Sequence, residues 1–147
     1  MKAAWSILRI VYGLFFLATG VWILVSVTTG ILKPPVQPTQ AAADFMQALD
    51  AALFVNPVLG ASFVFGGGCL IFGRSAPLGL ILLAPSVVVI LGFHLFLSGQ
   101  AAVGLIVATC FLLLAWRYRG AFVPLWTHRP EERPPLRSQE STFERGD

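Results

Sequence analysis

Long apolar runs without formal charge alternate with short polar breaks over most of the chain. The run at residues 77–97 carries no charge apart from the protonation of His94. It is long enough to cross a bilayer, since about 20 apolar residues at ~1.5 Å rise per residue cover a hydrocarbon core of ~30 Å. The pattern predicts an all-α protein, an antiparallel bundle of four transmembrane helices at about residues 5–28, 57–72, 77–97 and 101–116 within a membrane domain of residues 1–126.

The polar breaks predict how the spans are connected. Residues 29–40 contain three prolines, which end the first helix because proline lacks a backbone donor and disfavours helix in the residue before it. Residues 41–53 place apolar side chains on one side and polar ones on the other, which predicts a short amphipathic helix in the first outer loop. The tight turn at residues 73–76 makes the second and third spans a hairpin. Residues 127–147 are rich in charge and proline, so we expect a disordered cytoplasmic tail.

Small residues and one proline mark the predicted spans. Gly13 and Gly20 are seven residues apart and share a helix face, where another helix can approach closely. Gly66 and Gly67 belong to a glycine-rich second span, and we expect them to serve the same kind of packing. Pro85 lies in the middle of the third span and is expected to kink it, because proline frees a backbone carbonyl.

Composition narrows the class of protein. Hydrophobic residues make up 56% of the chain and charged residues 12%, against about 25% charged in an ordinary soluble domain. These values exclude a soluble globular, a disordered and a disulfide-rich secreted protein. The net charge of +3 is small and is not gathered on one helix face, so no nucleic-acid partner is expected. Cys69 and Cys110 both fall inside predicted spans without a CxxC motif, and we expect them to be inert packing residues.

Basic residues are distributed unevenly about the span ends. By the positive-inside rule, the side that holds more of them faces the cytoplasm. Arg9 lies about one turn inside the first span, from where its side chain reaches the headgroups while its stem stays in the apolar layer. We therefore expect a multi-pass topology with both termini in the cytoplasm, where Lys2, Arg9, Arg74, Arg117 and Arg119 lie, against Lys33 alone on the outer side.

His94 is the main candidate for chemistry. It lies about one turn from the outer end of the third span, and an ionisable group in a span is by default a functional hypothesis, because a partner must offset its desolvation. The alternative is a structural histidine that bonds a backbone carbonyl or a water molecule. The side-chain partners expected at that end are Asp50, Asp44, Asn56 and Gln100.

Other catalytic or metal-binding constellations are missing from the sequence. The second histidine, His128, lies in the tail on the opposite side, so neither a metal site nor a haem is expected. No nucleophile elbow, P-loop, dinucleotide-binding or zinc-protease motif is present. We therefore expect no catalytic activity from the chain on its own.

Four segments read together resemble the DoxX-like family of integral membrane proteins. They are LRIVYGLFFLATG in the first span, FGGGCLIFGR at the end of the second, LILLAPSVVVILGFHLFL in the third and AWRYRGAFVPLW after the fourth. The resemblance covers about residues 7–126 and implies a four-helix protein of the bacterial or archaeal inner (plasma) membrane, in a family with some members linked to quinone-dependent or thiol-related redox complexes. The positions that match the family's recurrent residues are Arg9, Gly13, Gly20, Gly67, Gly73, Arg74, Pro85 and His94.

The leading expectation from the resemblance is a membrane subunit or accessory of a quinone- or thiol-linked redox system. Quinone is the cofactor considered, with His94 as its contact and Asn56 and Asp50 nearby. The chain lacks two charges common in the family, an acidic residue at 62–63 and a lysine at 21–22, which suits a member that assembles with other proteins. The alternatives are a structural scaffold or anchor for a protein partner and, in third place, a small-solute transporter. The expected partners are the lipid bilayer, a membrane redox complex and a second copy of the chain.

Overall fold

The computed structural model describes residues 2–30 and 36–126, and every regular element in these two ranges is helical. The predicted disordered tail at residues 127–147 lies outside the described residues. The elements are the α-helices α1 (Lys2–Thr29), α2 (Gln40–Ala51), α3 (Val55–Phe72), α4 (Ala76–Gly92), α5 (Ala101–Arg117) and α6 (Arg119–Trp126), with the π-helical turn η1 (Phe93–Leu97) between α4 and α5.

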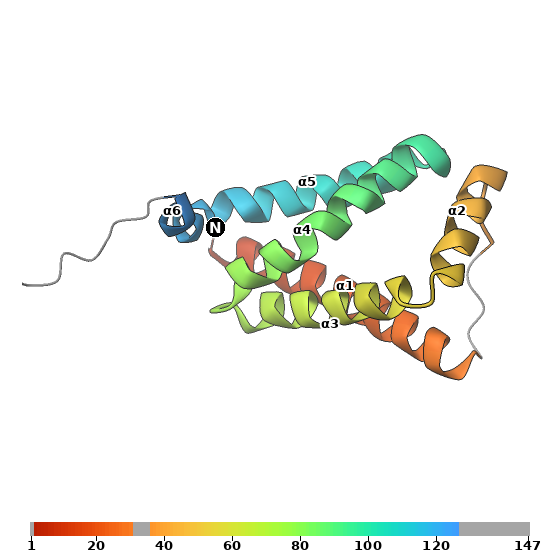
Figure 1. The fold of residues 1–147 in the computed structure, drawn as a ribbon. Helices are drawn as coiled ribbons and strands as arrows, with labels where there is room; N and C mark the ends of the chain where they lie inside the picture. The colour runs from red at the N-terminus through yellow and green to blue at the C-terminus, as the bar shows by residue number, and fades with distance from the viewer. Residues whose placement is uncertain (1, 31–35, 127–147) are drawn as a thin grey trace, which may run out of the picture.

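Two helix pairs form the body of the molecule. Helix α1 packs along α3, α3 packs on α4, and α4 packs on α5. Figure 1 shows the α1–α3 pair and the α4–α5 pair diverging toward the end at which α2 stands. Helix α2 contacts both α3 and η1 at that end, so it connects the two pairs where they are farthest apart.

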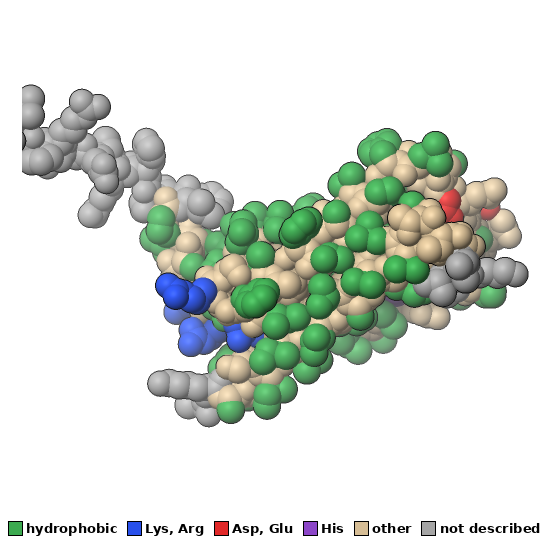
Figure 2. All heavy atoms as spheres, turned by 90° about the horizontal axis from the view of Figure 1, so that it is seen from below, with side chains coloured by type: hydrophobic (Ala, Val, Ile, Leu, Met, Phe, Trp, Pro, Cys, Tyr) green, Lys and Arg blue, Asp and Glu red, His purple; other side chains and the backbone are tan. Residues whose placement is uncertain are grey.

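The structure confirms the all-helical prediction within the described residues and shows helices suited to a membrane. Three helical segments are long and apolar enough to cross one: Ala3–Thr29, Val55–Phe72 and Ala76–Leu97. Helix α5 is also apolar but has only 17 residues. The amphipathic segment predicted at residues 41–53 is observed as α2. Apolar side chains cover the length of the molecule between its two ends in Figure 2, as a surface in contact with lipid tails requires.

Glycines bring the backbones of α1 and α3 into direct contact. A Cβ atom added to Gly67 would lie 2.6 Å from the carbonyl oxygen of Gly13, and one added to Gly20 would lie 2.7 Å from the carbonyl oxygen of Gly60. Real Cβ atoms essentially never approach closer than 3.0 Å. Only glycine therefore fits at these points of the α1–α3 interface.

A second face of α3 packs on α4 in the same way. A Cβ atom at Gly79 would lie 2.6 Å from the carbonyl oxygen of Gly66, and one at Gly66 would lie 2.7 Å from Cγ of Leu83. Adjacent residues Gly66 and Gly67 thus face different neighbours, α4 and α1. Helix α4 continues through Pro85 without a break, and the kink expected there stays a prediction.

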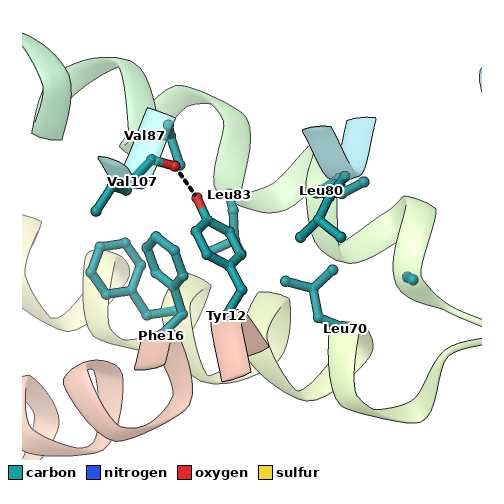
Figure 3. Close-up of a cluster of buried hydrophobic side chains, with 10 residues drawn as sticks. Tyr12, Phe16, Leu70, Leu80, Leu83, Val87 and Val107 are labelled. Carbon is teal, nitrogen blue, oxygen red and sulfur yellow. Dashed lines mark hydrogen bonds between the residues drawn. The ribbon is translucent and has the colours of Figure 1, made fainter. Parts of the chain in front are cut away.

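The buried core lies where the two helix pairs meet (Figure 3). Phe16 is fully buried and makes edge-to-face contacts with Tyr12 and Phe63, at centroid distances of 5.0 and 4.9 Å. The hydroxyl of Tyr12 donates a hydrogen bond of 3.0 Å to the carbonyl oxygen of Val107. This bond joins α1 to α5, and it satisfies a hydroxyl whose burial without a partner would cost about 1–3 kcal/mol.

The glycine contacts predict a contrast between two neighbouring positions. Gly67→Ala should destabilise the protein by about 1–3 kcal/mol, the usual cost of overpacking, because its Cβ meets the α1 backbone. Gly68→Ala is the matched control, since nothing lies within 4 Å of a Cβ there. We expect the first variant alone to lower the midpoint of thermal unfolding in mild detergent. Equal midpoints for the two variants would contradict the packing described.

Candidate functional site

Charge is segregated to the two ends of the molecule. The carboxylates in the described part of the chain are Asp44 and Asp50, and both lie on α2. Arg9, Arg74 and Arg117 line one pocket at the opposite end. Figure 2 shows the basic and acidic side chains at opposite ends, with apolar side chains between them. We call these the basic end and the α2 end.

His94 lies in η1 at the α2 end and bonds its own helix. Its Nδ1 is 2.9 Å from the carbonyl oxygen of Ile90, the backbone-carbonyl arrangement that the sequence left open as the alternative. The half-buried side chain packs on α5 at Gly104, where an added Cβ would come within 2.8 Å of the His94 Cβ. Its ring also makes an edge contact with Phe93 at a centroid distance of 5.3 Å.

The residues expected to partner His94 form their hydrogen bonds elsewhere. Asn56 donates to the carboxylate of Asp50, which links α2 to the first turn of α3. Asp44 accepts a hydrogen bond of 2.8 Å from the side chain of Gln40. The backbone N–H of Gln100 donates to the hydroxyl of Ser98. The structure therefore brings Asp50 and Asn56 together but bonds neither of them to His94.

The wide turn that carries His94 has identifiable supports. The backbone N–H of Ser98 donates to the carbonyl oxygen of Phe93, five residues earlier, at 2.9 Å. The hydroxyl of Thr39, just before α2, donates to the carbonyl oxygen of Leu97. The ring of Phe45 on α2 lies 5.7 Å from that of Phe93. Single π-helical turns of this kind occur frequently at functional sites.

The contact with Ile90 determines what the other nitrogen of His94 can do. A carbonyl oxygen only accepts, so Nδ1 must carry the proton that it donates. In a neutral imidazole Nε2 is then an acceptor. No hydrogen bond to Nε2 is formed by another residue within 2–30 or 36–126. His94 can therefore accept a hydrogen bond from the hydroxyl of a ligand.

At the basic end, Arg9 packs across the turn between α3 and α4. A Cβ added to Gly73 would lie 2.0 Å from a guanidinium nitrogen of Arg9, and the backbone of Gly73 has a positive φ of 73°. Arg74 follows directly and is exposed. The sequence predicted only the side of the membrane on which these two arginines lie. The antiparallel fold also brings Arg117, from the far end of α5, to the same pocket, which the sequence did not predict.

The described residues contain neither a cluster of potential metal ligands nor a disulfide. No group of three or more histidine, cysteine or acidic side chains there is placed to hold a metal ion. Cys69 and Cys110 are both free thiols and half-buried.

No family model, curated protein or solved structure matches this chain. The site must therefore be interpreted from its own geometry.

The contact between Arg9 and Gly73 can be tested against a second turn glycine. Gly73→Ala should cost more stability than Gly99→Ala. Both positions have positive φ, which costs an alanine about 1–2 kcal/mol, but only the Cβ at position 73 meets a side chain. Thermal unfolding in detergent measures the difference. Adding Arg9→Ala to Gly73→Ala should recover the excess cost, and no recovery would show that Arg9 does not occupy this position.

Proposed function

We propose that this chain is a four-span integral protein of the inner (plasma) membrane and an accessory subunit of a quinone-linked redox system, without catalytic activity of its own. The resemblance to DoxX-like proteins supports this proposal, as do the three long apolar helices. The basic residues support an orientation with the basic end in the cytoplasm. Helix α5, with 17 residues, extends about 25 Å, and snorkelling of Arg117 accommodates a span of that length.

The observation that carries the redox proposal is Nε2 of His94, to which no residue in the described ranges forms a hydrogen bond. A quinol presents hydroxyl groups, and Nε2 of the neutral imidazole accepts a hydrogen bond from such a donor. A quinone presents only carbonyl oxygens and would require the imidazolium instead. Binding through the neutral imidazole would therefore favour the reduced form, while electron transfer belongs to a partner subunit. The ring of Phe93 supplies an aromatic surface beside the imidazole, and the ring of Phe45 packs on Phe93 in turn.

A second candidate function, a membrane scaffold or anchor for a protein partner, is favoured by the joint between α2 and α3. Leu53 has a positive φ of 53°, which is strained for a leucine. Its side chain is 80% exposed and that of Phe54 is 71% exposed. A strained backbone that presents two large apolar side chains suits contact with another molecule.

The quinol proposal is tested with a substitution that keeps the structural bond of His94. In His94→Asn, the amide can still donate to Ile90, but the acceptor corresponding to Nε2 is lost. We expect the amount of isoprenoid quinol in the organic extract of the purified protein to fall about three- to tenfold. This is the loss of affinity that corresponds to the free energy of one hydrogen bond. Asp50→Asn is the matched control, because it removes a charge at the same end without contacting His94.

Mass spectrometry of the extract and of co-purifying proteins separates the two functions. Quinol retained by the wild type and by Asp50→Asn, with a redox enzyme among the co-purifying proteins, supports the accessory subunit. Wild-type protein that carries no quinol, or the same amount of it in His94→Asn, contradicts that proposal. A single stable protein partner that is lost in a Leu53→Ser, Phe54→Ser variant would instead support the scaffold.

A further inference from the structure

A pocket of about 440 Å³ opens at the basic end, opposite to His94. It is built by the first turns of α1, the turn between α3 and α4, and the last turn of α5 with the residue that follows. Three of its side chains are arginines from these three separate segments. The lining residues are Trp5, Ser6, Arg9, Phe72, Gly73, Arg74, Leu114, Arg117 and Tyr118.

The pocket concentrates positive charge, and no carboxylate of the described residues lies beside it. Arg9, Arg74 and Arg117 form neither an ion pair nor a hydrogen bond with another residue within 2–30 or 36–126. The two carboxylates of those ranges lie on α2 at the far end. Like charges gathered in one pocket repel one another, and an anion that all three contact relieves that repulsion.

Arg119 differs from the three pocket arginines in what its side chain contacts. It lies at the same end of the molecule but does not line the pocket. Its guanidinium stacks over the ring of Trp116 at 4.6 Å, a cation–π contact. Arg9, by contrast, lines the pocket and lies next to Gly73.

The arginines and the apolar residues that line the pocket together indicate which anion it binds. Guanidinium groups bind phosphate with two parallel hydrogen bonds, which makes arginine the preferred residue for phosphate recognition. Trp5, Phe72 and Leu114 add apolar surface beside the charges, and Tyr118 adds an aromatic ring of the type that gathers at headgroup level. Inorganic phosphate would leave that apolar surface unused, whereas a phospholipid carries acyl chains joined to its phosphate through glycerol.

We propose that this pocket binds the phosphate headgroup of an anionic phospholipid from the leaflet at the basic end. Arg9, Arg74 and Arg117 hold the phosphate, and the apolar lining contacts the first carbons of the lipid. The site lies at the opposite end of the bundle from His94. Lipid binding at this site can therefore be tested independently of quinol binding.

The test uses the full chain in nanodiscs that contain phosphatidylcholine with one-fifth phosphatidylglycerol, and native mass spectrometry counts the lipids retained after release. The wild type should retain phosphatidylglycerol in preference to phosphatidylcholine. The variant Arg74→Gln, Arg117→Gln should lose at least about tenfold in that preference, which corresponds to the loss of one hydrogen bond to a charged group. Arg119→Gln, the matched control, should keep the wild-type preference.

Each other outcome overturns the proposal. An equal loss in Arg119→Gln would show a general effect of charge rather than a site. Loss of the bound lipid on addition of 10 mM inorganic phosphate would identify a site for free phosphate. Preference that emerges only after removal of residues 127–147, which carry five of the seven acidic residues, would show that carboxylates of this chain occupy the pocket. Circular dichroism of each variant verifies that its helices are intact.

Discussion

Backbone contact between helices at paired glycines is the constraint on which the rest of this structure depends. In lipid, burial of apolar surface gives little drive for helix association, because the tails are as apolar as the side chains, so close van der Waals packing must supply it. Helix α3 provides this packing on two sides, with Gly67 against α1 and Gly66 against α4. Once these interfaces are set, the start of α1 must lie beside the turn that follows α3, and Arg9 meets Gly73 there.

The two ends of the bundle consequently offer different chemistry. Antiparallel packing gathers basic residues from three segments around one pocket, although they are far apart in the sequence. At the other end, α2 closes the space between the diverging helix pairs and supports the wide turn that holds His94. The Tyr12 hydroxyl, bonded to Val107, connects the pairs between these ends. The polar groups that we assign to ligands thus lie at opposite membrane faces in the proposed orientation.

Hydrophobic periodicity predicted the helices well because it reports local structure. The runs at residues 57–72 and 77–97 correspond to α3 and to α4 with η1, and the amphipathic segment became α2. Pairings between distant residues leave no such periodic signal. His94 lies in a π-helical turn whose carbonyl oxygens are bonded from outside it by Ser98 and Thr39. Arg117 lines the pocket because α5 runs back to the basic end, so basic residues at the ends of three apolar runs were the one available hint.

The most direct test of this account is the side of the membrane on which each connection lies. Single cysteines would replace Ser75, Gln100 and Gly120 in a background with Cys69→Ala and Cys110→Ala, and a membrane-impermeant maleimide would be applied to sealed cells and to inverted vesicles. We expect position 100 to be labelled in cells only, and positions 75 and 120 to be labelled in inverted vesicles only. Labelling of position 100 from the same side as either of the others would contradict the crossing of α4 or α5, and with it the four-span bundle.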